Sequence, residues 1–232
     1  MKRVTLIMAL LCLATLCFSC LAASPTAVSL GLSQIKESES ILGAPAKDQS
    51  TNATATSAPV QNKNITLLRQ DSGTNLSEMN RTYSVSPTYG SAQAVKFTSP
   101  KPGWRLEAVL VMATDGWNSS SKQLPTPLPF AIEIRDANLR LLYHFADTQL
   151  PYFTSNTGVR MAVIEVPALP IDGDFFVCFY GYRSLGLATE LQNATGNSHY
   201  FEKQTGLLYP GVLILRNNQT LPVNFIIRAF GE

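Results

Sequence analysis

Short apolar runs alternate with clusters of turn residues from about Asn64 to the end of the chain, and this rhythm constrains the fold more than any other feature. A spacing of roughly ten residues between runs is typical of all-β sandwiches and barrels. The run FAIEIRD at positions 130–136 has the period of a half-buried strand, because its three large apolar residues would share one face, opposite Glu133 and Arg135. We therefore expect strands at Thr66–Gln70, Ala92–Thr98, Arg105–Ala113, Phe130–Arg135, Arg140–Ala146, Val159–Val166, Asp174–Gly181, Tyr200–Lys203 and Val223–Phe230.

Turn residues separate these strands. The Asp-Gly pair at 172–173 and the segment DANL at 136–139 suit hairpins. The segment QLPTPLP at 123–129 is excluded from a sheet interior, because proline lacks the N–H that the ladder needs. Leu185–Leu191 is the one stretch of the body that could form a helical turn. We predict a single antiparallel β-sandwich, jelly-roll-like, over residues 64–232.

The run DFFVCFYG at 174–181 differs from the other strands because it is apolar on both faces. A strand of this kind is usually central in its sheet and covered on both sides. We expect its second face to lie under loops or under a bound partner. Cys178, in the middle of this run, is predicted to be a small buried hydrophobe rather than a nucleophile.

The first 23 residues resemble an export signal. A basic head at positions 1–3 precedes an almost unbroken apolar run, as in secretory signals. The run has about twenty residues, which is also the length of a minimal membrane span. Ser19-Cys20 has the pattern of a lipoprotein cleavage site, although Cys17 stands where leucine is usual, and the alanines at 22 and 23 suit ordinary cleavage equally well. Lipidation of Cys20, plain cleavage and a retained anchor all stay open.

Residues 24–63 are rich in Ser, Thr and Asn and have no apolar periodicity. Such a segment cannot bury enough surface to offset its ordering entropy, so we expect a disordered stalk between signal and sandwich. Seven Asn-x-Ser/Thr motifs are candidate glycan acceptors on exposed chain. They lie at Asn52, Asn64, Asn75, Asn80, Asn118, Asn193 and Asn218. Signal, stalk and sequons together predict a protein that is secreted or anchored at the outer face of the cytoplasmic membrane.

Charge and cysteine content exclude several classes of protein. The net charge is +2 with scattered Lys and Arg, so a nucleic-acid footprint is absent. Three of the four cysteines fall within residues 1–23, which leaves Cys178 alone in the body. An internal disulfide and a cysteine-based zinc site are therefore excluded there. A body of this length can instead be stabilised by its own apolar core.

Motifs of catalysis or cofactor binding are missing from the sequence. It has no GxSxG, no HExxH, no EF-hand spacing and no glycine-rich phosphate loop. His144 is expected to be a surface residue of a strand, opposite in direction to Tyr143. A hydrolase with two carboxylates remains a lesser alternative, because such pairs form in space rather than in sequence. We expect no catalytic residue, no metal ion and no cofactor.

Four segments carry a resemblance to a known module. The order PFAIEIRDANLRLLY, VIEVPALPIDGDFFVCFY, GNSHYF and NFIIRAFGE resembles a β-sandwich module that recurs in secreted and surface proteins of archaea, methanogens especially. The resemblance covers about Ala92–Glu232, and Cys178 stands where the family pattern usually has glycine. These motifs are structural, so the resemblance implies a fold and a compartment but no activity.

Aromatic residues near expected loops and strand ends are the strongest functional signal. Flat rings at the end of a sandwich can stack on sugars or anchor a protein contact. We therefore predict a non-enzymatic binding module for a glycan, an envelope polymer or a partner protein. A structural assembly subunit is the alternative. The predicted contact set is Trp117, Tyr182, Arg183, His199 and Tyr200.

Overall fold

The computed structural model describes residues 65–232 except 74, 119, 122 and 156–158. The predicted signal segment 1–23 with Cys20, the predicted stalk 24–63 and the sequons at Asn52 and Asn64 lie outside the described residues. The described strands are β1 (Thr66–Arg69), β2 (Arg81–Ser84), β3 (Ser91–Thr98), β4 (Trp104–Thr114), β5 (Pro129–Asp136), β6 (Leu141–Thr148), β7 (Met161–Ile171), β8 (Asp174–Tyr180), β9 (Gly186–Glu190), β10 (Ser198–Glu202), β11 (Leu207–Pro210), β12 (Val212–Ile214), β13 (Thr220–Pro222), β14 (Asn224–Phe225) and β15 (Ile227–Gly231). The one described helix is α2 (Leu150–Phe153).

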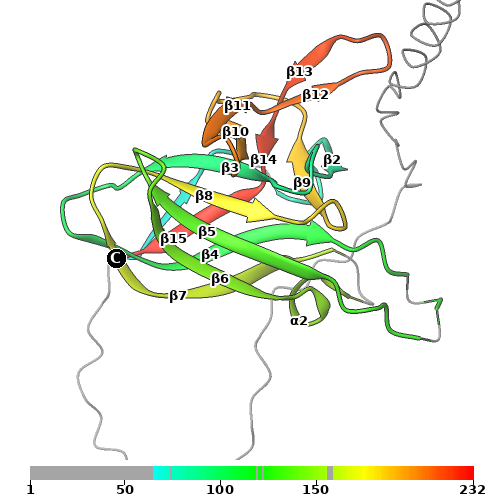
Figure 1. The fold of residues 1–232 in the computed structure, drawn as a ribbon, viewed down its shortest axis with the longest axis horizontal. Coiled ribbons are helices and arrows are strands. Elements are labelled where there is room, and N and C mark those ends of the chain that lie inside the picture. The colour runs from blue at the N-terminus through cyan, green and yellow to red at the C-terminus, as the bar shows by residue number, and fades with distance from the viewer. Residues whose placement is uncertain (1–64, 74, 119, 122, 156–158) are drawn as a thin grey trace, which may run out of the picture. The chain divides into compact units, whose positions relative to one another are not determined.

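Two antiparallel sheets pack face to face, which confirms the all-β sandwich (Figure 1). One sheet has six strands in the order β11-β10-β3-β8-β5-β6. The other has seven, with β1-β15-β4-β9-β14 in a row, β7 on β4 and β2 on β9. A separate hairpin pairs β12 with β13.

The core between the sheets consists of the inward residues predicted from strand alternation. Phe130, Ile132 and Ile134 of β5 are fully buried in it, whereas Arg135 points away and is half-buried. Trp104 at the start of β4 is also fully buried and packs 5.8 Å from the Phe175 ring. Because the described part contains no disulfide, this apolar core is its main source of stability.

Strand β8 is central in the six-stranded sheet, between β3 and β5, as its apolar sequence predicted. Phe175, Val177 and Phe179 belong to the main core. The alternate residues on the far side are buried as well, and side chains of the same sheet and its loops cover them. The two-sided apolar pattern therefore predicted the strand's place correctly.

Leu185–Leu191 does not form the helical turn that the sequence allowed. Gly186–Glu190 is strand β9, which pairs with β2, with β14 and with the end of β4. The local sequence was ambiguous, and long-range hydrogen bonds decided the conformation. The short helix α2 was not expected either, and it is a single turn with a proline in its first positions.

Strand β7 continues past its expected end at Val166 to Ile171, through Pro167 and Pro170. Prolines are tolerated there because β7 is hydrogen-bonded on one side only, to β4. The last expected strand, Val223–Phe230, is interrupted at Ile226. The Ile226 N–H donates to Ala188 of β9, so the chain leaves β9 here and continues along β4.

Candidate functional site

The face of the six-stranded sheet remote from the core, here called the outer face, is buried by its own long side chains. The Arg135 guanidinium lies 4.5 Å from the centre of the Phe201 ring, and the Lys203 ammonium lies 5.5 Å from that of Tyr180. Long cationic side chains can cover apolar surface while keeping their charge near water. The buried hydrophobic residues of this face are Ala92, Ala94, Ala131, Phe176, Cys178, Tyr180 and Phe201.

Glu133 is the charged centre of the outer face and is only 1% exposed. Its Oε2 accepts hydrogen bonds from Arg135 at 2.6 and 2.9 Å and from the Tyr180 hydroxyl at 2.9 Å. Its Oε1 accepts one from Lys203 at 2.9 Å. Burial alone would raise the pKa of Glu133, but these hydrogen bonds outweigh burial and hold the pKa below its usual value. The carboxylate is therefore ionised and its bonding capacity is used; we call these four residues the Glu133 cluster.

Three tyrosines form a stack that leads from this buried face into solvent. Tyr182 stacks on Tyr180 with ring centres 6.1 Å apart and on Tyr89 with ring centres 4.9 Å apart. Tyr180 is buried, whereas Tyr89 is 63% exposed. Burial raises the pKa of Tyr182, so its hydroxyl stays neutral and able to donate a hydrogen bond. This aromatic stack (Tyr89, Tyr180 and Tyr182) presents a supported, flat apolar surface.

The turn that holds Tyr182 is strained. Tyr182 and Arg183 have φ angles of +47° and +62°, and the Ser184 N–H donates to the Gly181 carbonyl at 2.8 Å. Positive φ at both central residues is the geometry of a type I′ turn, which favours Asn-Gly. A left-handed residue other than glycine costs about 1–2 kcal/mol. Backbone strain of this kind is found mainly at functional sites, where a side chain has to be held in one position. In this turn, the strained backbone holds Tyr182 against Tyr89.

Trp117 lies at the same end of the sandwich as this turn. Thr114 pairs with Gly186, so the loop after β4 and the turn before β9 leave the sheet together (Figure 1). The Trp117 indole N–H donates to the Gln123 carbonyl at 3.0 Å, within its own loop, and the side chain is half-buried. The structure thus gathers Trp117, Tyr182 and Arg183 at one end.

His199 and Tyr200 are neighbours on β10 and point to opposite faces. Tyr200 packs against Phe225 of the core with ring centres 5.3 Å apart, and burial raises its pKa to about 12. His199 lies on the outer face, edge-on to Phe176. The five residues of the predicted contact set therefore do not form one site.

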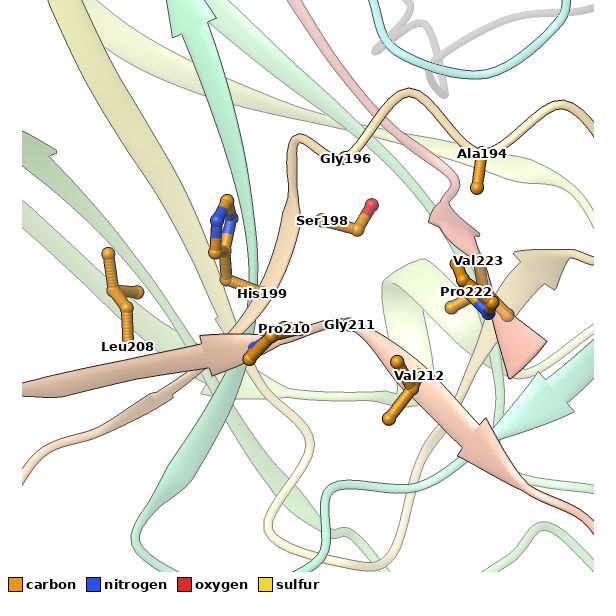
Figure 2. Close-up of a pocket in the computed structure, with 10 residues that line it drawn as sticks. All are labelled: Ala194, Gly196, Ser198, His199, Leu208, Pro210, Gly211, Val212, Pro222 and Val223. Carbon is orange, nitrogen blue, oxygen red and sulfur yellow. The ribbon is translucent and has the colours of Figure 1, made fainter. Parts of the chain in front are cut away.

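His199 borders a shallow hollow of about 380 Å³ (Figure 2). Burial lowers its pKa, so the imidazole is neutral at pH 7. Its Nδ1 lies 3.1 Å from the Asn197 carbonyl, which can only accept, so Nδ1 carries the proton and Nε2 is an acceptor. The other lining residues are mainly small and apolar: Ala194, Gly196, Ser198, Leu208, Pro210, Gly211, Val212, Pro222 and Val223.

Sequence reasoning missed Tyr89 and Lys203. Tyr89 stands before a glycine in the loop between β2 and β3, and Lys203 directly follows β10. Turn composition could have marked both as exposed. Tyr89 contacts Tyr182, roughly ninety residues away in the chain, and Lys203 contacts Tyr180, roughly twenty residues away. The local periodicity of the sequence cannot reveal contacts between such distant segments.

Cys178 is fully buried, as the sequence predicted. Burial raises the pKa of its thiol to about 12, so the reactive thiolate is absent at neutral pH. Among the described residues, no group of three or more His, Cys, Asp or Glu side chains could hold a metal ion. In the same residues, no helix has the length and apolar character needed to cross a bilayer.

All sequons within the described residues have exposed asparagines. At Asn75 and Asn118 the side-chain oxygen accepts a hydrogen bond from the backbone N–H two residues on, at 3.1 and 2.9 Å. This is an Asx turn, in which the asparagine side chain bonds to the backbone of its own loop. The five exposed acceptors, none on a strand of the six-stranded sheet, are Asn75, Asn80, Asn118, Asn193 and Asn218.

No family model, no curated protein and no solved structure matches this chain significantly. The resemblance to the archaeal surface module therefore stays a prediction.

Proposed function

We propose that this protein is an extracytoplasmic, non-enzymatic binding module, secreted or membrane-tethered, that holds a cell-envelope glycan against the aromatic stack. The observation that carries the proposal is the exposed Tyr89 ring, supported from beneath by Tyr182 and Tyr180. A tyrosine has an apolar ring and a polar hydroxyl, so it suits an interface that combines apolar contact with hydrogen bonds to solvent or ligand. A ring already held in place loses little entropy when a ligand binds.

Polar groups for sugar hydroxyls surround the stack. Arg183 is exposed in the same turn, and the Lys203 side chain is 56% exposed while its ammonium is bound to Glu133. Thr88 directly precedes Tyr89 in the chain. Its hydroxyl donates a 3.0 Å hydrogen bond to the Glu202 carboxylate, which brings Glu202 close to the loop that carries Tyr89. A flat ring with a few polar groups around it is the usual makeup of a small-ligand site.

Two observations support the compartment. The sequence begins with an export-like segment, and every described sequon asparagine is exposed. None of these asparagines lies on a strand of the six-stranded sheet, so no glycan at these positions would be attached directly to its outer face.

The two alternative functions rest on other features. A hydrolase would need a carboxyl group with a raised pKa as its general acid, whereas the Glu133 cluster lowers the pKa of its carboxyl. An assembly subunit would use an open sheet edge rather than the aromatic stack.

The test is binding of the full chain to deproteinised envelope polysaccharide of its own source organism, together with an array of neutral, amino and uronic oligosaccharides. Tyr89→Ala combined with Tyr182→Ala should weaken binding at least roughly tenfold, because hot-spot aromatics dominate such contacts. Trp117→Ala combined with Tyr182→Ala tests the loop at the same end. Tyr89→Phe keeps the flat ring and should bind like the unchanged chain.

The matched control is Tyr209→Ala, since Tyr209 is also a half-exposed tyrosine but lies on β11, away from the stack. Binding that survives both double substitutions rejects the proposal. Binding only to envelope preparations that retain their proteins, and lost after protease treatment, would indicate a partner protein instead.

A further inference from the structure

The open edges of the two sheets differ in how well they are protected against pairing with another chain. Edge strands expose unpaired backbone groups, and natural proteins blunt them with prolines, charges or short length. Strand β7 carries Pro167, Pro170 and the left-handed residue Ala168. Strands β1 and β11 have four residues each, and β11 ends in a proline.

Strand β6 has neither a proline nor a short length to protect it, although it is the outermost strand of the six-stranded sheet (Figure 1). Its eight residues, LLYHFADT, contain no proline, glycine or lysine. Leu141 and Leu142 are 51% and 42% exposed, and Asp147 is its only permanent charge. A long apolar edge of this kind is a template for strand pairing.

The backbone groups that β6 leaves open follow from its pairing with β5. Gln149 N–H donates to the Leu128 carbonyl at 3.0 Å. In an antiparallel ladder the direction of the backbone groups alternates from residue to residue. Tyr143, Phe145 and Asp147 therefore direct their backbone groups toward β5, while positions 144, 146 and 148 direct theirs away from the sheet.

We propose that β6 pairs antiparallel with β6 of a second copy of this chain, about a two-fold axis through Phe145. This register uses the regular part of β6 and leaves the irregularity near Leu141 at its end. Tyr143 would lie opposite Asp147, and His144 opposite Ala146, so no like charges face each other. The two Phe145 rings would meet across the axis, as aromatic pairs favour.

The occupant is a second copy because the edge complements itself. Positions 144 and 146 share the outer side of the sheet and both present open backbone groups, so each can exchange hydrogen bonds with the other in the second copy. The exposed apolar residues Leu141 and Leu142 flank the pairing on both sides. The result is one continuous antiparallel sheet made from the six-stranded sheets of two copies.

The two-fold axis is perpendicular to the sheet, so the outer faces of both copies point to the same side. Both aromatic stacks would then address one envelope surface, and a bivalent contact binds more tightly than a single one. This consequence rests on the proposed function, whereas the dimer itself does not.

The test is sedimentation velocity of the full chain over a hundredfold concentration range, in a non-ionic detergent that occupies the N-terminal apolar run. The unchanged chain should show a concentration-dependent dimer. Ala146→Glu should weaken the dimer at least roughly tenfold, because two carboxylates would lose water at the seam. The matched control is Leu67→Glu on β1, at the edge of the seven-stranded sheet opposite β7 and at a residue that is 44% exposed, and it should leave the dimer unchanged.

A charge pair tests the register. Adding His144→Lys to Ala146→Glu places the introduced lysine opposite the introduced glutamate of the second copy and should restore the dimer. Thermal melting of each variant checks that it is folded. The proposal is overturned if the chain is monomeric at all concentrations, if Ala146→Glu leaves the dimer unchanged, or if the double variant fails to restore it. Loss of glycan binding by the stack variants with an intact dimer would reject only the proposed function.

Discussion

At the scale of single residues, Glu133 shows how a charge can be kept inside an apolar face. The outer face of β8 is as apolar as a core, yet its neighbour β5 places a carboxylate beside it. Two cations and one phenol use the bonding capacity of that carboxylate. The same cations cover the rings of Phe201 and Tyr180, so one cluster satisfies the charge and shields the apolar surface.

The Glu133 cluster predicts a pH-dependent stability. Because the folded pKa of Glu133 lies below its ordinary value of 4.5, the ionised form stabilises the fold above that pH, and this contribution is lost as the pH falls through the folded pKa. Glu133→Gln should lower the free energy of unfolding by roughly 3 kcal/mol at pH 7, since Arg135 loses its charged partner and keeps only the Leu139 carbonyl. The difference from the unchanged chain should shrink below pH 4.5.

Urea denaturation at pH 7, 5 and 3 measures this dependence. Glu165→Gln, at an exposed position of β7, is the control and should change stability little at any of these values. A Glu133→Gln difference that stays constant from pH 7 to pH 3 contradicts the assignment.

At the scale of elements, the turn from β8 to β9 trades stability for the position of Tyr182. A two-residue turn with positive φ would be most stable with Asn-Gly, but this chain has Tyr-Arg. The turn nevertheless keeps its closing hydrogen bond, from the Ser184 N–H to the Gly181 carbonyl, so the loss of stability is confined to the backbone strain of the turn. Backbone strain of this kind is found mainly at functional sites, and the proposed function gives Tyr182 such a role.

Arg183→Gly should raise the free energy of unfolding by about 1 kcal/mol, because glycine adopts the left-handed conformation without a Cβ clash. Arg183→Ala removes the same exposed side chain but keeps the clash, so it should give no gain. Equilibrium unfolding of both variants in urea makes the comparison. Equal effects of the two substitutions would show that the turn is not strained at this position.

At the scale of the whole molecule, burial of apolar side chains is the main source of stability of the described domain. Its two largest apolar clusters are the main core and the covered outer face, and β8 contributes to both. Cys178 lies in the second layer with no exposed surface. Its thiol should therefore become accessible only when the sheet opens.

Alkylation of Cys178 by iodoacetamide at pH 8 should be extremely slow in the folded chain, because the thiol is buried and its pKa is raised to about 12. The rate should increase with urea in parallel with global unfolding. Mass spectrometry of the peptide that contains Cys178 separates it from the three N-terminal cysteines. Rapid labelling without denaturant would mean that the outer face opens locally.

Alternation predicted most of this sandwich before the structure. Strands such as β5 and β8 were found because their apolar residues repeat with the period of the pleat, and that signal is local. At strand β9 the sequence allowed a helical turn, because five residues carry too weak a pattern to distinguish a strand from a turn. Of the predicted contact set, Tyr182 and Arg183 lie at the aromatic stack, whereas His199 borders a separate hollow and Tyr200 packs on the core.

The sequence by itself determined the fold class, the central position of β8 and the burial of Cys178, because periodicity and turn chemistry act over a few residues. Only the tertiary structure decided which faces and loops meet. It joined Tyr89 to Tyr182, placed Glu133 between Arg135 and Lys203, and left β6 as an open edge. The physical reason is that sheet order and register are set by pairing between distant segments, which no local pattern specifies.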